Sequence, residues 1–162
     1  MTQSPQAPLP AQSPQAPLPP ALEEIAEDFN AMTAGERLQL LLEFSDGLPE
    51  LPDRYLGHSE LMEQVPECQS PLFLAVELDA SEGGAGTVHL YFDAPRAAPT
   101  TRGFAGILHA GLDGLSAADL LSVPDDAPYR FGLGEAVSPL RLRGMVSMLG
   151  RIKRQVRDKA AA

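Results

Sequence analysis

Apolar side chains recur at helical spacing in the first part of the chain that has a regular pattern. Between residues 22 and 32 acidic residues occupy positions between them, and the apolar set is Leu22, Ile25, Ala26, Phe29 and Met32. This spacing predicts an amphipathic helix. Thr33 and Glu36 then have the spacing of a capping box, which predicts a second helix. Its expected apolar stripe is Leu38, Leu41, Leu42 and Ser45, and Gly47 and Pro49 are expected to end it.

The pattern changes to alternation in the middle of the chain. Residues Leu72–Asp79 and Thr87–Phe92 place apolar side chains at every second position, which predicts two strands with one buried face. The glycine-rich segment 81–86 between them predicts a hairpin turn. A third short strand, or a turn, is expected around Asp93–Thr100. Residues Leu48 to Pro71 contain four prolines and predict a long irregular connection.

Helical patterns return after the strands. Residues Arg102 to Leu112 and Ser116 to Leu121 are expected to be helical, with Ser116 as an N-cap. Ser138-Pro139 predicts the start of a final helix, whose apolar stripe is Leu142, Met145, Val146, Leu149, Ile152 and Val156. The order of elements predicts an α+β fold. We expect a small antiparallel sheet of about three strands, covered by helices, with a long C-terminal helix.

The first twenty residues differ from the rest in composition. The octet QSPQAPLP occurs twice, at residues 3–10 and 12–19. Such a proline-rich repeat cannot bury a core. We therefore expect residues 1–20 to form a disordered tail and residues 21–162 to form one folded domain.

The charge of the chain is unevenly distributed. The formal net charge is −10, yet the last 22 residues carry seven basic residues and one acidic residue, a net +6. The remainder, at −16, would repel phosphate, which argues against nucleic acid as a partner. The chain lacks an apolar run long enough to span a bilayer and a basic, apolar start typical of a signal peptide, so no membrane association is expected. Together with a single cysteine, these features favour a reducing cytoplasm.

Cys68 is the only cysteine among the 162 residues. One thiol cannot form an internal disulfide or hold a zinc ion or an iron–sulfur cluster by itself, so no metal site is expected. Pro66 and Pro71 flank the cysteine and favour turn and extended backbone, which predicts an exposed loop. A small buried hydrophobic residue is the alternative interpretation. A cysteine–histidine hydrolase is disfavoured, because nothing in the pattern marks His58, His89 or His109 as a partner of the thiol.

Four blocks of sequence resemble the SufE family. They are Leu48-Pro-Glu-Leu-Pro52, Val65-Pro-Glu-Cys-Gln-Ser70, Arg102-Gly103, and Ser138-Pro-Leu-Arg141 with Arg143-Gly-Met145, in this order and at the family's spacing. The resemblance covers residues 21–159. It implies a SufE/IscU-like fold and a role as a sulfur acceptor in iron–sulfur cluster assembly, without a cofactor and without stand-alone enzymatic activity.

The resemblance also implies roles for individual residues. Cys68 matches the cysteine that accepts a persulfide from a cysteine desulfurase (SufS-like), stimulates that enzyme, and passes the sulfur to a scaffold complex (SufBCD-like). Gln69 and Ser70 match the loop that carries it, and Glu67 is the loop residue that precedes the cysteine. Arg102 and Arg141 match basic positions with a structural or docking role. A monomer or weak homodimer is expected.

Two charged residues are expected to act on the thiol. Glu67 stands where the family commonly has glycine, and a carboxylate beside the thiol should raise its pKa. Arg141, if it lies near the thiol, would favour the thiolate.

Two other functions are compatible with the same residues. The first is a passive module that docks on a desulfurase or scaffold and regulates it, with Cys68 as an ordinary loop residue. The second is a thiol redox sensor, in which Cys68 is oxidised by mild peroxide without any desulfurase.

Overall fold

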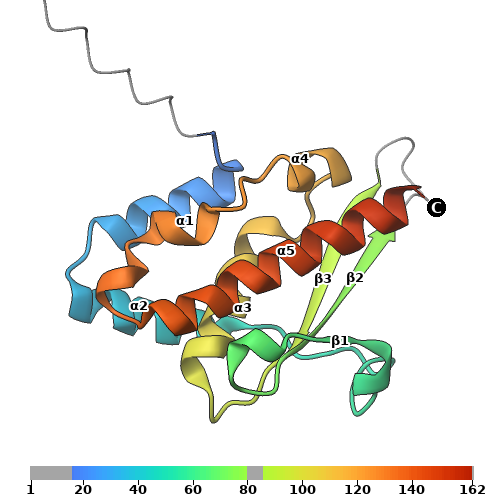
Figure 1. Cartoon of the computed structure of the whole chain (residues 1–162), viewed down its shortest axis with the longest axis horizontal. Helices are drawn as coiled ribbons and strands as arrows, with labels where there is room; N and C mark the ends of the chain where they lie inside the picture. The colour runs from blue at the N-terminus through green and yellow to red at the C-terminus, as the bar shows by residue number, and fades with distance from the viewer. Residues whose placement is uncertain (1–15, 80–85, 162) are drawn as a thin grey trace, which may run out of the picture.

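The chain folds into a three-stranded antiparallel sheet packed against helices (Figure 1). The structure, a computed structural model, describes residues 16–79 and 86–161. The predicted hairpin turn at 81–86, apart from Gly86, and most of the predicted proline-rich tail lie outside these residues. The α+β class, the small antiparallel sheet and the long C-terminal helix are confirmed.

Two helices begin the described part of the chain, α1 (Pro20–Asn30) and α2 (Ala34–Gly47). The capping box predicted for α2 is present, because Thr33 and Glu36 each accept a hydrogen bond from the backbone N–H of the other. The expected stripe of α2 is partly wrong: Leu41 and Ser45 are buried, but Leu38 is exposed and Leu40 and Phe44 pack against the core instead. Leu18 is already buried, so packed structure begins before the expected boundary at Ala21.

The sheet consists of β1 (Glu63–Gln64), β2 (Phe73–Asp79) and β3 (Thr87–Asp93), in the order β1-β2-β3. The predicted alternation holds in β3, where Val88, Leu90 and Phe92 are buried. The segment Asp93–Thr100, expected to form a third strand or a turn, contains a turn closed by a hydrogen bond from Ala98 N–H to the Pro95 carbonyl at 3.0 Å, so the third strand does not lie there. It comes instead from the connection expected to be irregular, where Glu63 pairs with Leu74 and Gln64 with Phe73.

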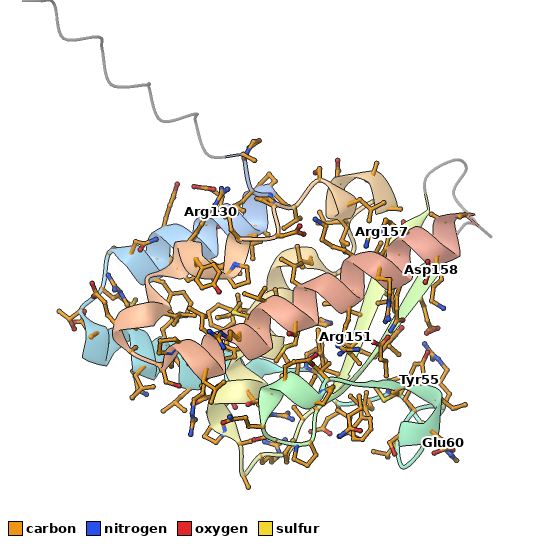
Figure 2. The ribbon with its side chains drawn as sticks, in the orientation of Figure 1. Tyr55, Glu60, Arg130, Arg151, Arg157 and Asp158 are labelled. Atoms are coloured by element: carbon orange, nitrogen blue, oxygen red, sulfur yellow. The ribbon has the colours of Figure 1, made fainter. Side chains whose placement is uncertain are left out.

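That connection also contains two single turns of 3-10 helix, η1 (Ser59–Leu61) and η2 (Pro66–Cys68). Arg54, near its start, lies over the rings of Tyr55 and Tyr91 and forms an ion pair with Glu77 at 2.6 Å. Figure 2 shows Tyr55 on this segment. These contacts hold the segment against the hairpin.

The later helices are α3 (Pro99–Leu112), α4 (Ala117–Leu121) and α5 (Pro139–Ala161), with η3 (Ala127–Phe131) and η4 (Leu133–Glu135) before α5. Ser116 caps α4 through Asp119 N–H, and Ser138 accepts a hydrogen bond from Arg141 N–H at the start of α5, as predicted. Helix α3 packs against α1 and α2, and α5 crosses β2 and contacts η2 (Figure 1). In the described residues no helix is both long and apolar enough to cross a membrane.

Candidate functional site

Cys68 ends the short helical turn η2, at the tip of a loop that leaves the sheet and returns to it. The base of the loop is closed by a hydrogen bond from Val65 N–H to the Leu72 carbonyl, at 2.9 Å, and both of these side chains are fully buried. Only residues 66–71 lie between them. The loop therefore has a rigid base and a short tip, and we call residues 66–71 the cysteine loop.

The local sequence explains the turn. Pro66 is preorganised for the first position of η2, and Cys68 N–H then donates to the Val65 carbonyl at 3.2 Å. Gln69 follows with φ of 60°, a left-handed conformation that is uncommon for a residue with a side chain. This reversal turns the chain toward Pro71 and β2.

Helix α5 covers the sulfur. The Cys68 Sγ lies 3.7 Å from the Gly144 carbonyl oxygen, to which the thiol donates a weak hydrogen bond. A Cβ atom added at Gly144 would lie 3.1 Å from that sulfur, so the absence of a side chain lets the helix approach this closely. Cys68 is consequently only 6% exposed. The expectation of an exposed cysteine is wrong for this conformation: the loop is at the surface, but its thiol faces the helix.

The surroundings of the thiol favour its neutral form. The pKa of Cys68 is raised from 9.0 to about 12, first because burial disfavours the thiolate and second because of the adjacent Glu67 carboxylate. Arg151 acts in the opposite direction. The sign expected for Glu67 is thus the one found. In this closed conformation the thiol is a poor nucleophile at neutral pH.

The basic neighbour of the thiol is Arg151 rather than Arg141. Arg151 Nη2 donates to both carboxylate oxygens of Glu67, at 2.8 and 3.1 Å, which ties the cysteine loop to α5. Figure 2 shows Arg151 on α5, beside the turn that carries the cysteine. Arg141 lies in the exposed first turn of α5, and within the described chain its guanidinium makes no hydrogen bond or ion pair.

Arg102 is placed away from the cysteine loop. It is 7% exposed and donates to the carbonyl oxygens of Ser45, Ala94 and Leu48, at 2.9, 2.7 and 3.4 Å. A positive charge at the C-terminal end of α2 also complements the helix dipole. Arg102 therefore joins α2 to the segment after β3, and its burial favours the structural one of the two expected roles. Gln69 is exposed and Ser70 is half-buried in the loop.

Sequence reasoning missed Arg151 and Gly144 as neighbours of the thiol. The spacing contained a signal for Arg151, because residues seven apart lie on the same face of a helix. Once Gly144 is known to face the loop, Arg151 follows two turns later. The contact of Gly144 with Cys68, across 76 residues, has no such local signal.

The other chemically active side chains do not complete a catalytic site at Cys68. His58 pairs with Glu60 at 2.9 Å, and His89 and His109 face Asp113 at 3.9 and 3.7 Å. Within the described residues, none of the three hydrogen-bonds to Cys68. Across residues 16–79 and 86–161, no group of three or more histidine, cysteine or acidic side chains is arranged to hold a metal ion.

A groove runs along α5 beside the cysteine loop. It has a volume of about 440 Å³ and is lined by Pro66, Glu67, Gln69, Leu140, Arg143, Val146 and Ser147. Leu140 is 48% exposed and contributes apolar surface to the groove. The groove thus combines an apolar surface with the guanidinium of Arg143, next to the turn that carries the sulfur.

Comparison with known proteins agrees with this architecture. Residues 23–156 match the model of the SufE family, described as an Fe-S metabolism associated domain. Two relatives, the uncharacterized SufE-like proteins of Mycobacterium tuberculosis strains CDC 1551 / Oshkosh and ATCC 25618 / H37Rv, are each 55% identical over 137 residues, or 85% of this chain and 92% of theirs.

A solved structure shows the same fold. It is the solution structure of a hypothetical protein from Thermus thermophilus, which is 39% identical and has a TM-score of 0.73. The match covers 90% of this chain and 99% of that chain. On these similarities in sequence and fold, the chain belongs to the SufE family, the Fe-S metabolism associated domain.

Proposed function

We propose that this protein accepts sulfur on Cys68 from a cysteine desulfurase, and that it passes the sulfur to a scaffold complex that assembles iron–sulfur clusters. The observation that carries the proposal is the placement of the chain's single sulfur nucleophile, at the tip of a six-residue loop with a fixed base. Membership of a family associated with Fe-S metabolism supports the same conclusion.

The transfer needs no electron donor. The Cys68 thiolate attacks the terminal sulfur of the persulfide on the desulfurase cysteine. The sulfur–sulfur bond of the desulfurase breaks as the new bond to Cys68 forms, and the desulfurase cysteine leaves as a thiolate. The proton released by the Cys68 thiol ends on that leaving thiolate. One sulfur atom has moved, and the protein that carries it is now a persulfide.

The closed conformation makes this reaction dependent on the partner. A thiol that is buried and has a pKa of about 12 reacts poorly with a persulfide in open solvent. Release of the cysteine loop into the desulfurase would remove the burial that raises the pKa. The reaction would then be confined to the complex, and the desulfurase would turn over faster because its own persulfide is cleared.

We assign the groove beside the cysteine loop as the surface that meets the desulfurase. It lies next to the sulfur, its apolar part includes the exposed Leu140, and Arg143 makes no ion pair within the described chain. A matching partner surface would present apolar side chains and a carboxylate close to its persulfide cysteine.

Intact-mass spectrometry tests the acceptor role. We expect that incubation with the cognate desulfurase and free cysteine adds the mass of sulfur to the wild-type protein, removable by a reductant, and none to Cys68→Ser. Trypsin digestion would place the added sulfur on the peptide that contains residue 68. Wild-type protein that stays unmodified while the desulfurase itself carries a persulfide would refute the proposal.

The same variant separates the alternatives. A passive regulatory module would stimulate the desulfurase equally well as Cys68→Ser, whereas an acceptor would lose the stimulation. A redox sensor would form a sulfenic acid on Cys68 under mild peroxide alone. Burial of the sulfur argues against that reaction, because oxidation follows exposure and thiolate character.

A further inference from the structure

Arg151 connects the cysteine loop to the sheet as well as to its own helix. One of its terminal nitrogens donates to Glu67 in the loop, and the other donates to Glu63 in β1 at 2.6 Å. Both contacts are ion pairs, and the Arg151 side chain is only 26% exposed between the two carboxylates. The two ion pairs, with Glu63 and with Glu67, therefore fix the position of its guanidinium.

Glu63 is the fixed side of this arrangement. It is held in the sheet by the pairing of Glu63 with Leu74, and Arg154 and Gln155 also donate to its carboxylate. Burial acts to raise the pKa of Glu63, but the hydrogen bonds from Arg151, Arg154 and Gln155 outweigh it and leave the pKa lowered. Glu63 is thus a charged anchor at neutral pH, and it orients Arg151 toward the loop.

Glu67 is the side that can move. It belongs to the cysteine loop, its side chain is 42% exposed, and it lines two grooves of about 440 and 340 Å³. Among the described residues, the hydrogen bonds that join the cysteine loop to α5 are those of Glu67 with Arg151 and of Cys68 with Gly144. The second is a weak bond from a thiol. Gln69, next to it, is in the left-handed conformation, which is strained for a residue with a side chain.

We propose that Arg151 is a positioning residue whose ion pair with Glu67 holds the cysteine loop closed, and so sets how often Cys68 is released. This rests on the proposed function for its biological purpose, because release is what makes the sulfur available to the desulfurase. The closed and released states can nevertheless be measured without any partner. Breaking the ion pair should increase the population of released loops.

The direction in which Arg151→Gln changes the reaction rate of Cys68 distinguishes this role from a simple electrostatic effect on the thiol. As a nearby positive charge, Arg151 favours the thiolate, so its loss alone would make Cys68 react more slowly. As the residue that holds the loop closed, its loss would make Cys68 react faster. The two interpretations of Arg151→Gln therefore predict opposite changes.

Alkylation of the full-length protein by iodoacetamide, at fixed pH and without desulfurase, measures release. We expect Arg151→Gln to react roughly two- to fivefold faster than wild type, which is the range for a partly exposed ion pair. Glu67→Asp keeps the charge beside the thiol but shortens the reach to Arg151, so it should be faster as well. Arg154→Gln is the matched control: it removes the same charge one turn away, from a residue that pairs with Glu63 and not with Glu67. Its rate should equal that of wild type.

The double variant Arg151→Gln with Glu67→Asp should react no faster than the faster single variant, because both remove one interaction. Additive effects, or an Arg151→Gln rate equal to or below wild type, would overturn the proposal. If Arg151→Gln has a lowered urea midpoint, its faster alkylation could come from a less stable fold. The test then rests on Glu67→Asp, and an unchanged alkylation rate in that variant contradicts the proposal.

Desulfurase assays then connect the loop to sulfur transfer. Arg151→Gln should need about two- to fivefold less protein for half-maximal stimulation, with the maximal rate unchanged, because more of it is competent to bind. If alkylation is accelerated as expected but no sulfur ever reaches Cys68, the positioning role stands and the proposed function fails. If sulfur reaches Cys68 but the variants are alkylated at the wild-type rate, the proposed function stands and the positioning role of Arg151 fails.

Discussion

At the scale of single residues, the state of the thiol depends on how closely Gly144 approaches it. The sulfur and the Cα of Cys68 would lie 3.1 and 3.2 Å from a Cβ at residue 144, tighter than ordinary van der Waals contact. Any side chain there must push the loop outward by a few tenths of an ångström. The glycine therefore determines how well the helix can seal the sulfur.

We predict that Gly144→Ala loosens the cysteine loop. The added methyl group costs about 1 kcal/mol of contact strain in the closed conformation, so alkylation of Cys68 should be about fivefold faster. Gly150→Ala is the control, because it lies in the same helix with nothing within 4 Å of the added methyl group. An equal alkylation rate in both variants would show that residue 144 does not seal the thiol.

Gly144→Ala should also change the pH dependence of alkylation. The folded-state pKa of Cys68, about 12, lies above the ordinary 9.0, so burial stabilises the closed form at low pH and this contribution is lost as the pH rises from about 9 to about 12. In wild type the rate should therefore keep rising between pH 8 and pH 10. In Gly144→Ala the apparent pKa should be lower than in wild type by less than one unit, because about 1 kcal/mol of strain is smaller than the roughly 1.36 kcal/mol that corresponds to one pKa unit. A series of alkylation rates against pH measures both proteins.

The sequence singles out Cys68 as the candidate sulfur acceptor but does not predict its surroundings. Prolines on both sides of Cys68 predict the backbone of a turn, and η2 confirms the turn. They carry no information about which way the sulfur points, because its cover comes from α5, 76 residues away. The motif predicts Arg141 as the basic neighbour, whereas the position of Arg151 follows from helix periodicity only once Gly144 is known to face the cysteine loop.

At the scale of elements, the approach of α2 to α3 depends on two glycines of α3. A Cβ at Gly103 would lie 2.6 Å from the Leu41 carbonyl oxygen, and one at Gly106 would overlap the Phe44 carbonyl. Backbone atoms of the neighbouring helix cannot give way as the end of a side chain can. The glycines thus set the spacing of the helix pair that supports the sheet.

We predict that Gly106→Ala lowers the free energy of unfolding by about 1–3 kcal/mol, the usual range for overpacking a core. Gly150→Ala, on the exposed side of α5, should instead raise it by roughly 0.5–1 kcal/mol through helix propensity. Urea denaturation monitored by circular dichroism measures both. Equal midpoints for the two variants would contradict the close packing of α2 on α3.

Elements with a local signal were predictable, and those without one were not. The capping box before α2, Ser116 before α4 and Ser138-Pro139 before α5 each name a helix start in a few residues. Strand β1 has only two residues, Glu63 and Gln64, and no alternation can be read in two positions. It becomes a strand because its backbone pairs with the free edge of β2. This pairing depends on the fold rather than on the sequence of the segment.

At the scale of the whole molecule, the charge is separated between an acidic body and a basic last helix. Part of this basic charge is satisfied internally, since Arg151, Lys153 and Arg154 pair with Glu63, Glu67 and Asp125. Arg143 is not among these pairs and lines the groove beside the cysteine loop. The basic side chains at the start of α5 are thus available to an acidic partner.

We predict that Arg143→Glu weakens the affinity for the cognate desulfurase roughly tenfold. The affinity of wild type should also fall more steeply with salt concentration than that of the variant, because salt screens the attraction that Arg143 provides. Arg157→Glu, near the other end of α5, is the control and should bind like wild type. Isothermal titration calorimetry at two ionic strengths measures both. Comparable weakening by the two variants would point to overall charge rather than to this groove.

The hydrogen bond from Val65 to Leu72 limits how far the sulfur can travel. A chain of six residues fixed at both ends can project at most about half its extended length, on the order of 10 Å. The cysteine loop alone could not reach a desulfurase persulfide that is buried deeper than this. Under the proposed function, the length of the cysteine loop therefore sets the greatest depth of a partner's active site from which Cys68 can accept sulfur.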